Sequence, residues 1–67
     1  MTLKLREERH KRSWSLVDVT MKTGISSADV SLIERGLKPA YPGWRRRIAK
    51  AFNMSEAELF REVEDDS

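Results

Sequence analysis

The middle of the chain contains two short helix-forming stretches that are separated by a single glycine. Each stretch follows a serine with an acidic residue three positions later, Ser15 with Asp18 and Ser26 with Asp29. This spacing is typical of a capping box, in which the two side chains satisfy free N–H groups at the start of a helix. Gly24 can adopt the left-handed conformation that ends the first helix. The sequence therefore predicts two helices that meet at a tight turn.

Helical spacing continues along the rest of the chain. Trp44, Ile48 and Phe52 recur at intervals of four and predict one buried helix face. Ser55 and Glu58 have the spacing of a third capping box. No stretch alternates polar and apolar residues as a strand would. The expected helices cover residues 2–12, 16–23, 27–35 and 42–52, with a fifth from residue 55.

The composition excludes several classes of site. The 67 residues make one domain with a small core. The absence of Cys excludes disulfides and thiolate metal sites, and a single His, His10, cannot form a zinc site alone. We find no catalytic constellation and no phosphate-cradling glycine loop, so we expect no enzymatic activity, no metal and no cofactor.

The N-terminal region and the apolar segments argue against a membrane protein. No stretch approaches the roughly 20 apolar residues that a membrane-spanning helix needs. Charged residues interrupt any apolar stretch near the N-terminus, so it does not resemble a signal peptide. We therefore expect a soluble, cytoplasmic protein that does not bind membranes.

Charge is distributed unevenly along the chain. The formal net charge is only +2, but Arg61 is the sole basic residue beyond residue 50, whereas acidic residues accumulate there. A basic body with an acidic tail favours an anionic partner for the body, although a solvated surface of mixed charge would show the same pattern. We assign residues 1–60 to one domain and residues 61–67 to an acidic C-terminal tail.

Two helices joined by a tight turn are the layout of a helix-turn-helix motif, whose second helix enters the major groove of DNA. The sequence resembles the lambda repressor/Cro-type (Xre-like) helix-turn-helix family over about residues 3–60. The blocks that carry the resemblance are Trp14-Ser15, Val19-Thr20-x-x-x-Gly24-Ile25-Ser26, Val30-Ser-x-Ile33-Glu34-Arg35-Gly36 and Ile48-Ala-Lys-Ala-Phe-Asn-Met-Ser-x-x-Glu58-Leu59-Phe60.

The resemblance implies an all-α fold of five short helices, in which the second and third form a DNA-binding helix-turn-helix. It also aligns Arg9 and Glu34 with two family residues that pair between the first and third helices. A partly buried pair of this kind would fix the angle of the third helix more than it would stabilise the fold.

Helix geometry identifies the residues that would face DNA. With Val30 and Ile33 turned inward, the opposite side of the third helix and its first turn would meet the bases. The candidates for base contact are Ser27, Ala28, Ser31 and Leu32. Family members often have longer polar side chains there, which bond base edges bidentately. The alternative is that these are small surface residues without a role.

Basic residues and helix caps are candidates for contact with the DNA backbone, and such contacts would make affinity fall steeply with salt. The alternative is an ordinary solvated basic face. The candidates for phosphate contact are Ser15, Lys22, Arg35, Lys38, Arg45 and Arg46.

These observations predict a sequence-specific regulator of transcription, repressor-like, that binds double-stranded DNA as a homodimer on a palindromic operator. The expected dimer contacts are Leu59, Phe60 and Val63, and no small-molecule effector is evident. The alternative is a protein-interaction module, antitoxin-like or cofactor-like, with little base readout. An outward apolar set favours it: Leu16, Val17, Met21 and Leu32.

Overall fold

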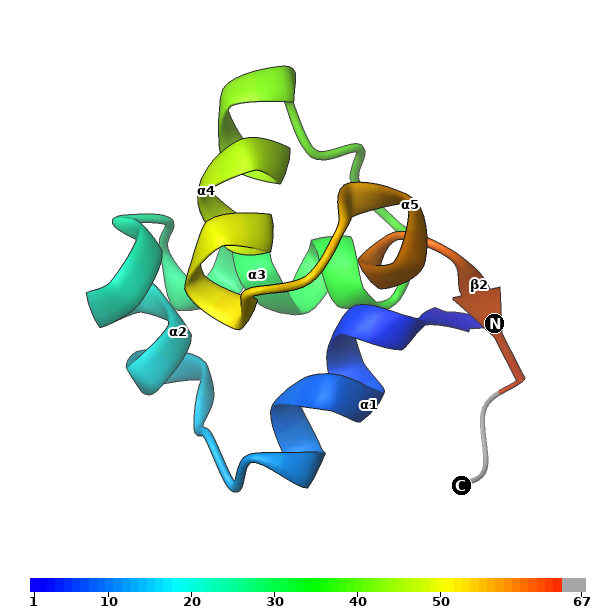
Figure 1. Ribbon diagram of the computed structural model, residues 1–67, viewed down its shortest axis with the longest axis horizontal. Helices are drawn as coiled ribbons and strands as arrows, with labels where there is room; N and C mark the ends of the chain where they lie inside the picture. The colour runs from blue at the N-terminus through cyan, green and yellow to red at the C-terminus, as the bar shows by residue number, and fades with distance from the viewer. Residues whose placement is uncertain (65–67) are drawn as a thin grey trace.

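The structure is a computed structural model that describes residues 1–64 (Figure 1). Within these residues it contains α1 (Lys4–Lys11), α2 (Leu16–Thr23), α3 (Ser27–Glu34), α4 (Pro42–Phe52) and α5 (Glu56–Leu59), together with two short strands, β1 (Thr2–Leu3) and β2 (Glu62–Val63). The predicted all-α fold of five short helices is confirmed. The end of the predicted acidic tail, Asp65 to Ser67, lies outside the described residues.

The first residues of the chain form a strand, whereas the sequence predicted a helix from residue 2. In an antiparallel pair, Thr2 lies opposite Val63 and Leu3 lies opposite Glu62. The prediction was wrong because the hydrogen-bond partners come from residues 61–63, and local periodicity cannot show a partner so distant in the chain. Residues that we assigned to the tail therefore pair with the N-terminal strand.

Serine caps start three of the helices as predicted, but only one capping box is complete. The backbone N–H of Asp18 donates to Ser15 Oγ over 3.0 Å, and the Ser15 N–H donates to Asp18 Oδ2 over 2.7 Å. Ser26 and Ser55 accept the corresponding bonds at the starts of α3 and α5. The return bond is missing at both, and Asp29 accepts a bond from the Ser26 hydroxyl instead, over 2.9 Å.

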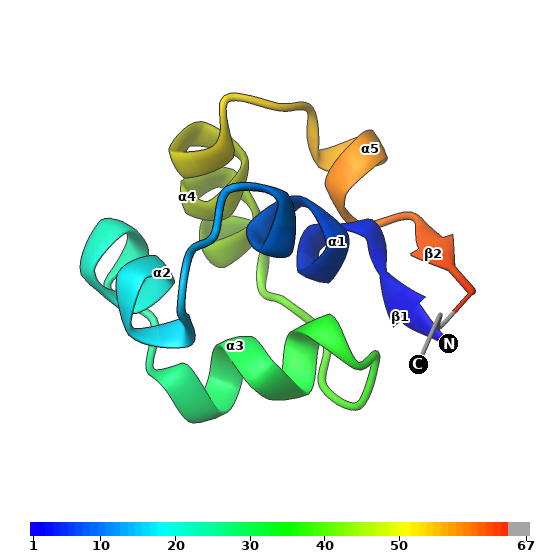
Figure 2. The same ribbon diagram turned by 90° about the horizontal axis from the view of Figure 1, so that it is seen from below.

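The other four helices all lie on one side of α3, and the core lies between them and α3 (Figures 1 and 2). Trp14, in the α1–α2 connection, packs edge-on against Phe52 at 4.9 Å between ring centroids. The predicted stripe on α4 is confirmed, with Ile48 and Phe52 buried and Trp44 partly buried. The buried hydrophobic residues are Leu5, Val19, Ile25, Val30, Ile33, Ile48, Phe52 and Leu59.

A buried carboxylate ties α1 to the end of α4. Glu8 accepts a hydrogen bond from Arg12 Nη1 at 2.7 Å and forms ion pairs with Lys11 at 3.3 Å and Lys4 at 3.4 Å. Arg12 also donates to the carbonyl of Phe52 over 3.1 Å. The bond from Arg12, followed by those from Lys11 and Lys4, lowers the pKa of Glu8 to about 2. Glu8 is therefore charged at neutral pH and holds three cations together.

Candidate nucleic-acid interface

Helix α3 runs along one edge of the molecule, and one of its sides is open to solvent (Figure 2). Its inner side is anchored by Val30, Ile33 and Glu34, which are all buried. On the outer side Ala28 is exposed and Leu32 is partly exposed. The orientation predicted from helix geometry is therefore the observed one, and α3 can approach a groove without disturbing the core.

The turn before α3 is tight because Gly24 adopts a left-handed conformation, with φ of 77°. Its N–H donates to the carbonyl of Thr20 over 2.7 Å, which closes the last turn of α2. Ile25 follows at once and is buried in the core. The turn therefore sets the position of α3 relative to α2 through one glycine and one apolar anchor.

An ion pair fixes the other end of α3 to α1. Arg9 Nε donates to Glu34 Oε2 over 2.6 Å and Arg9 Nη2 donates to Glu34 Oε1 over 3.1 Å, a bidentate arrangement. Arg9 Nη1 also donates to the carbonyl of Trp14 over 2.8 Å. The pair that the resemblance implies is thus present and almost fully buried, with 11% of the Arg9 side chain and 3% of the Glu34 side chain exposed. Neither residue is placed to contact DNA.

The first residue of α3 is engaged by α2. Ser27 Oγ lies 3.0 Å from Thr20 Oγ1, within hydrogen-bond distance. Ser27 is only partly exposed, unlike its neighbour Ala28. A base contact by Ser27 would therefore share its hydroxyl with Thr20.

The predicted outward apolar set is smaller than expected. Val17 and Met21 are exposed on α2, at 59% and 80%. Leu16, however, is partly buried and packs against the core, and Leu32 is only partly exposed. Leu16 was misplaced because it occupies the first turn of α2, close to the neighbouring helices, where the helical period alone does not show packing.

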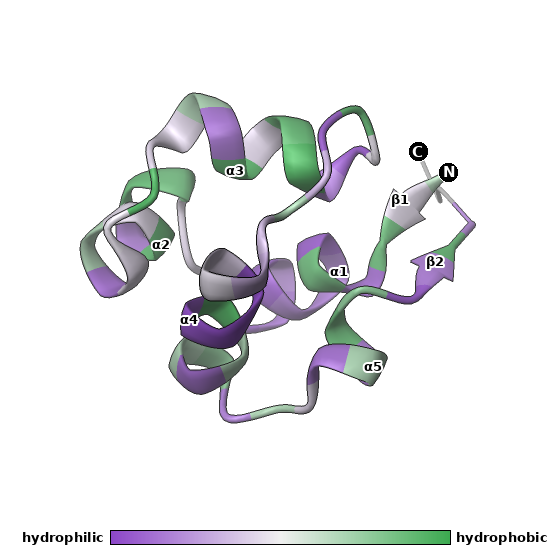
Figure 3. Ribbon diagram, turned by 90° about the horizontal axis from the view of Figure 1, so that it is seen from above, coloured by the Kyte–Doolittle hydropathy of each residue, from purple (hydrophilic) through white to green (hydrophobic). Residues whose placement is uncertain are grey.

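The basic side chains predicted to contact phosphate divide into two groups. Arg35 and Arg46 are exposed. Figure 3 shows strongly hydrophilic segments on the ribbon of α4, the helix to which Arg46 belongs. Lys22 is also exposed, and its ammonium group lies 4.6 Å from the centroid of the Trp14 ring. Ser15 is exposed at the start of α2, with its hydroxyl committed to the cap.

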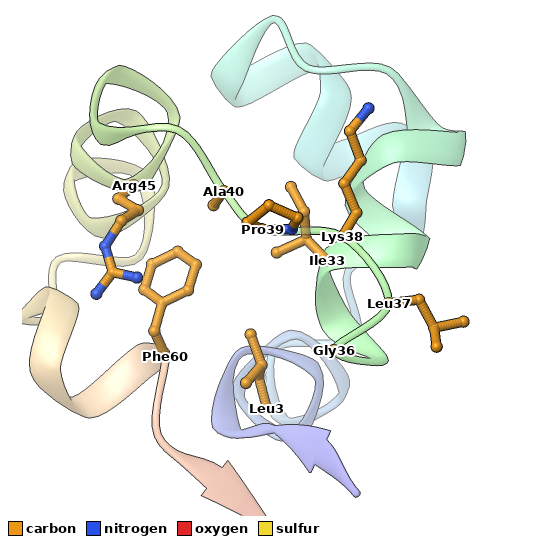
Figure 4. A pocket seen from close by; sticks show the side chains of 9 residues that line it. All are labelled: Leu3, Ile33, Gly36, Leu37, Lys38, Pro39, Ala40, Arg45 and Phe60. Carbon is orange, nitrogen blue, oxygen red and sulfur yellow. The ribbon is translucent and has the colours of Figure 1, made fainter.

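Arg45 is directed away from α3. Its Nε donates to Glu56 Oε1 over 3.1 Å, and its guanidinium lies 4.3 Å from the centroid of the Phe60 ring. Figure 4 shows both side chains on one side of a cavity of about 340 Å³, beside Leu3 and opposite the α3–α4 connection. In this arrangement Arg45 joins α4 to α5. Its contact with phosphate stays a prediction, in which the guanidinium would be shared with Glu56.

The third of the consecutive arginines on α4 was not among the residues predicted to contact phosphate. Arg47 is exposed, and its Nη1 lies 3.9 Å from the position that a Cβ on Gly24 would occupy. It is therefore the member of the Arg45–Arg47 run that lies beside the turn before α3. A helical wheel shows that the three arginine side chains point in different directions. Only the packed structure shows which of them points toward that turn.

Of the three predicted dimer contacts, Leu59 needs correction, whereas Phe60 and Val63 stay predictions. Leu59 is fully buried in the core of the single chain, so it has no surface to offer a second copy. Phe60 is partly buried beneath Arg45, and Val63 belongs to β2. The sequence predicted a start for the fifth helix at residue 55 but no end, and α5 ends at Leu59, before Phe60 and Val63.

None of the helices in residues 1–64 has the length and apolar character needed to cross a membrane. Nowhere in the same range do three or more His, Cys, Asp or Glu side chains gather in a way that could hold a metal ion.

The comparisons with known proteins agree with this geometry. A family model described as a helix-turn-helix domain matches residues 1–61. No curated protein and no solved structure matches the chain. The match to the family model spans α1 to α5, including the turn at Gly24 and the buried pair that orients α3. The chain belongs to the helix-turn-helix domain family.

Proposed function

We propose that this protein is a regulator of transcription that reads the major groove of double-stranded DNA with α3. The observation that carries the proposal is the position of α3, which lies at the edge of the molecule with an open outer side. The turn at Gly24 and the Arg9–Glu34 pair hold this helix at both ends. A helix fixed in this way can enter a groove with little loss of conformational entropy.

The outer side of α3 favours modest discrimination between bases. Ala28 and Leu32 can contact thymine methyl groups, and Ser31 can bond to several bases. A good bidentate contact is worth about 1–3 kcal/mol of discrimination, and none of these three side chains can make one. Specificity is therefore expected to depend on two copies that read two half-sites.

We also propose that the two copies meet at the end of the molecule that carries both strands. Met1 is 73% exposed and Leu37 is 67% exposed. The Met1 carbonyl lies 3.8 Å from the position that a Cβ on Gly36 would occupy, and Thr2 pairs with the partly exposed Val63. This end also lies beside the C-terminal end of α3 (Figure 2). A two-fold axis there would place both copies of α3 on the same side of a dimer, as a palindromic operator requires.

A second candidate function rests on Val17 and Met21, which lie about one helical turn apart on α2 and are both exposed. An exposed apolar patch marks contacts with other proteins where it extends over neighbouring residues. In this case the fold would act as a protein-interaction module, and base readout would be weak or absent.

Selection of bound duplexes from a random pool at low salt tests the proposed function. We expect an enriched palindromic motif whose affinity falls steeply as salt rises, because each phosphate contact adds about 0.9 to the slope of log K against log salt. Leu32→Ala should alter the motif, whereas Arg46→Ala should weaken all duplexes alike. Failure to enrich any motif would refute sequence-specific regulation, and loss of a defined protein complex on Met21→Ser would favour the interaction module.

A further inference from the structure

The predicted phosphate contact Lys38 is held in place by α3 itself. Lys38 Nζ donates to Asp29 Oδ1 over 2.7 Å, and it lies 5.5 Å from the centroid of the Trp44 ring. The carboxylate of Asp29 is fixed in turn, because its Oδ2 accepts a bond from the Ser26 hydroxyl over 2.9 Å. An acid in the first turn of α3 and a ring at the start of α4 therefore hold one ammonium group from two directions.

The pair lies beside the surface that would meet DNA. Asp29 follows Ala28 directly, and Lys38 belongs to the connection between α3 and α4. Figure 4 shows the Lys38 side chain pointing away from the cavity and along α3. About a third of each side chain remains exposed, 31% for Lys38 and 27% for Asp29.

The chemistry of the ammonium group allows it to serve two partners. A protonated lysine has three N–H donors, and Asp29 accepts only one of them. The bond from Lys38 lowers the pKa of Asp29, and the bond to Asp29 raises the pKa of Lys38, so the pair stays ionised at neutral pH. A free lysine must also give up much more side-chain entropy when it binds an anion.

We propose that Asp29 is a positioning residue for DNA binding. Its carboxylate and the Trp44 ring hold the Lys38 ammonium beside α3, and the remaining N–H donors bind a phosphate of the DNA backbone. This inference rests on the proposed function, and it goes beyond it by assigning a favourable role to an acidic residue next to an anionic ligand.

Charge repulsion alone predicts a different effect on DNA binding when the Asp29 carboxylate is removed. A carboxylate near a phosphate is repulsive, and at short range in water the repulsion is about 1 kcal/mol. If repulsion were the only effect, Asp29→Asn would tighten binding by the same factor whether or not residue 38 is a lysine. If Asp29 positions Lys38, the effect of Asp29→Asn must depend on residue 38.

A double-mutant cycle separates the two mechanisms. Binding to one duplex is measured at fixed low salt for the wild type, Asp29→Asn, Lys38→Met and the double variant. We expect a coupling of about threefold to tenfold between the two positions, which corresponds to the cost of immobilising one long side chain. Lys22→Met is the matched control, since Lys22 also lies over a tryptophan ring but is not bonded to Asp29. Its coupling to Asp29→Asn should be absent.

A second measurement does not depend on DNA. In NMR spectra of the free protein, the Lys38 ammonium should exchange its protons more slowly than that of the exposed Lys50, and Asp29→Asn should remove the difference. Unchanged exchange in Asp29→Asn would overturn the proposal whatever the DNA result. Slow exchange with additive effects on binding would also overturn it, in favour of repulsion alone. If the wild type bound no duplex, the proposed function would fail and the phosphate role with it, while the exchange data would still show the pair.

Discussion

Two neighbouring residues of α1 connect it to two different helices. Glu8 reaches the end of α4 through Arg12, whereas Arg9 reaches the end of α3 through Glu34. Consecutive residues of a helix point about 100° apart, so adjacent side chains can serve different neighbours. A short helix with few apolar residues therefore orients the rest of the molecule through buried charge.

The low pKa of Glu8 makes one contribution to stability depend on pH. The pKa falls from an ordinary 4.5 to about 2 on folding, so the contribution is complete above pH 4.5 and is lost as pH falls toward 2. Glu8→Gln should cost about 2 kcal/mol at pH 7, or about 10 °C in Tm, and almost nothing at pH 2. Thermal unfolding followed by circular dichroism at both pH values measures this. Glu7→Gln is the control, because Glu7 is exposed and should show little effect; an equal loss for Glu8→Gln at both pH values would contradict the argument.

At the scale of the elements, the helix boundaries follow from local chemistry, and sequence reasoning placed most of them. The Ser15 box and the left-handed Gly24 involve residues within four positions of one another, so the local pattern contains all the information. The strands were missed because each depends on a partner at the other end of the chain. The box at Ser26 was predicted to be complete, but its return bond is absent for a similar reason, since Asp29 bonds to the distant Lys38.

The turn before α3 can be tested with two glycines that have opposite requirements. Gly24 has φ of 77°, and an added Cβ would make only an ordinary van der Waals contact, 3.9 Å to Arg47 Nη1, so Gly24→Ala should cost about 1 kcal/mol through backbone strain alone. Gly43 lies in α4, and no atom lies within 4 Å of the position that its Cβ would take. Gly43→Ala should therefore stabilise the protein by about 0.5–1 kcal/mol. Urea unfolding gives both values, and the same sign for both would refute the assignment of strain to Gly24.

At the scale of the whole molecule, the sequence predicted the fold, the orientation of α3 and the buried Arg9–Glu34 pair. It did not predict which basic side chains already bond to other parts of the protein. Three consecutive arginines on α4 look equivalent in the sequence, yet Arg45 packs on α5 and Arg47 lies beside the turn at Gly24. Such differences arise from packing between elements. The helical period shows in which direction each side chain points, but it does not show which neighbouring element lies in that direction.

The proposed dimer surface predicts different outcomes for two exposed apolar residues. Leu37→Ser should shift the protein toward monomer and weaken binding to a palindromic duplex, because Leu37 belongs to the strand-bearing end. Val17→Ser is the matched control, with a similar exposure on α2, and should leave self-association unchanged. Sedimentation across a concentration series measures both. A wild type that stays monomeric at every concentration, on and off DNA, would rule the surface out.

The β1–β2 pair also has a consequence for synthesis of the chain. It joins residues 2 and 3 to residues 62 and 63, and the buried Leu59 immediately precedes it. Residues 2 and 3 are synthesised long before residues 62 and 63, so the first strand must wait for its partner. Until then one side of the core lacks Leu59 and stays exposed. A chain truncated before residue 59 would therefore expose apolar surface to proteases. The helix-turn-helix is thus completed by a segment that follows it by more than twenty residues.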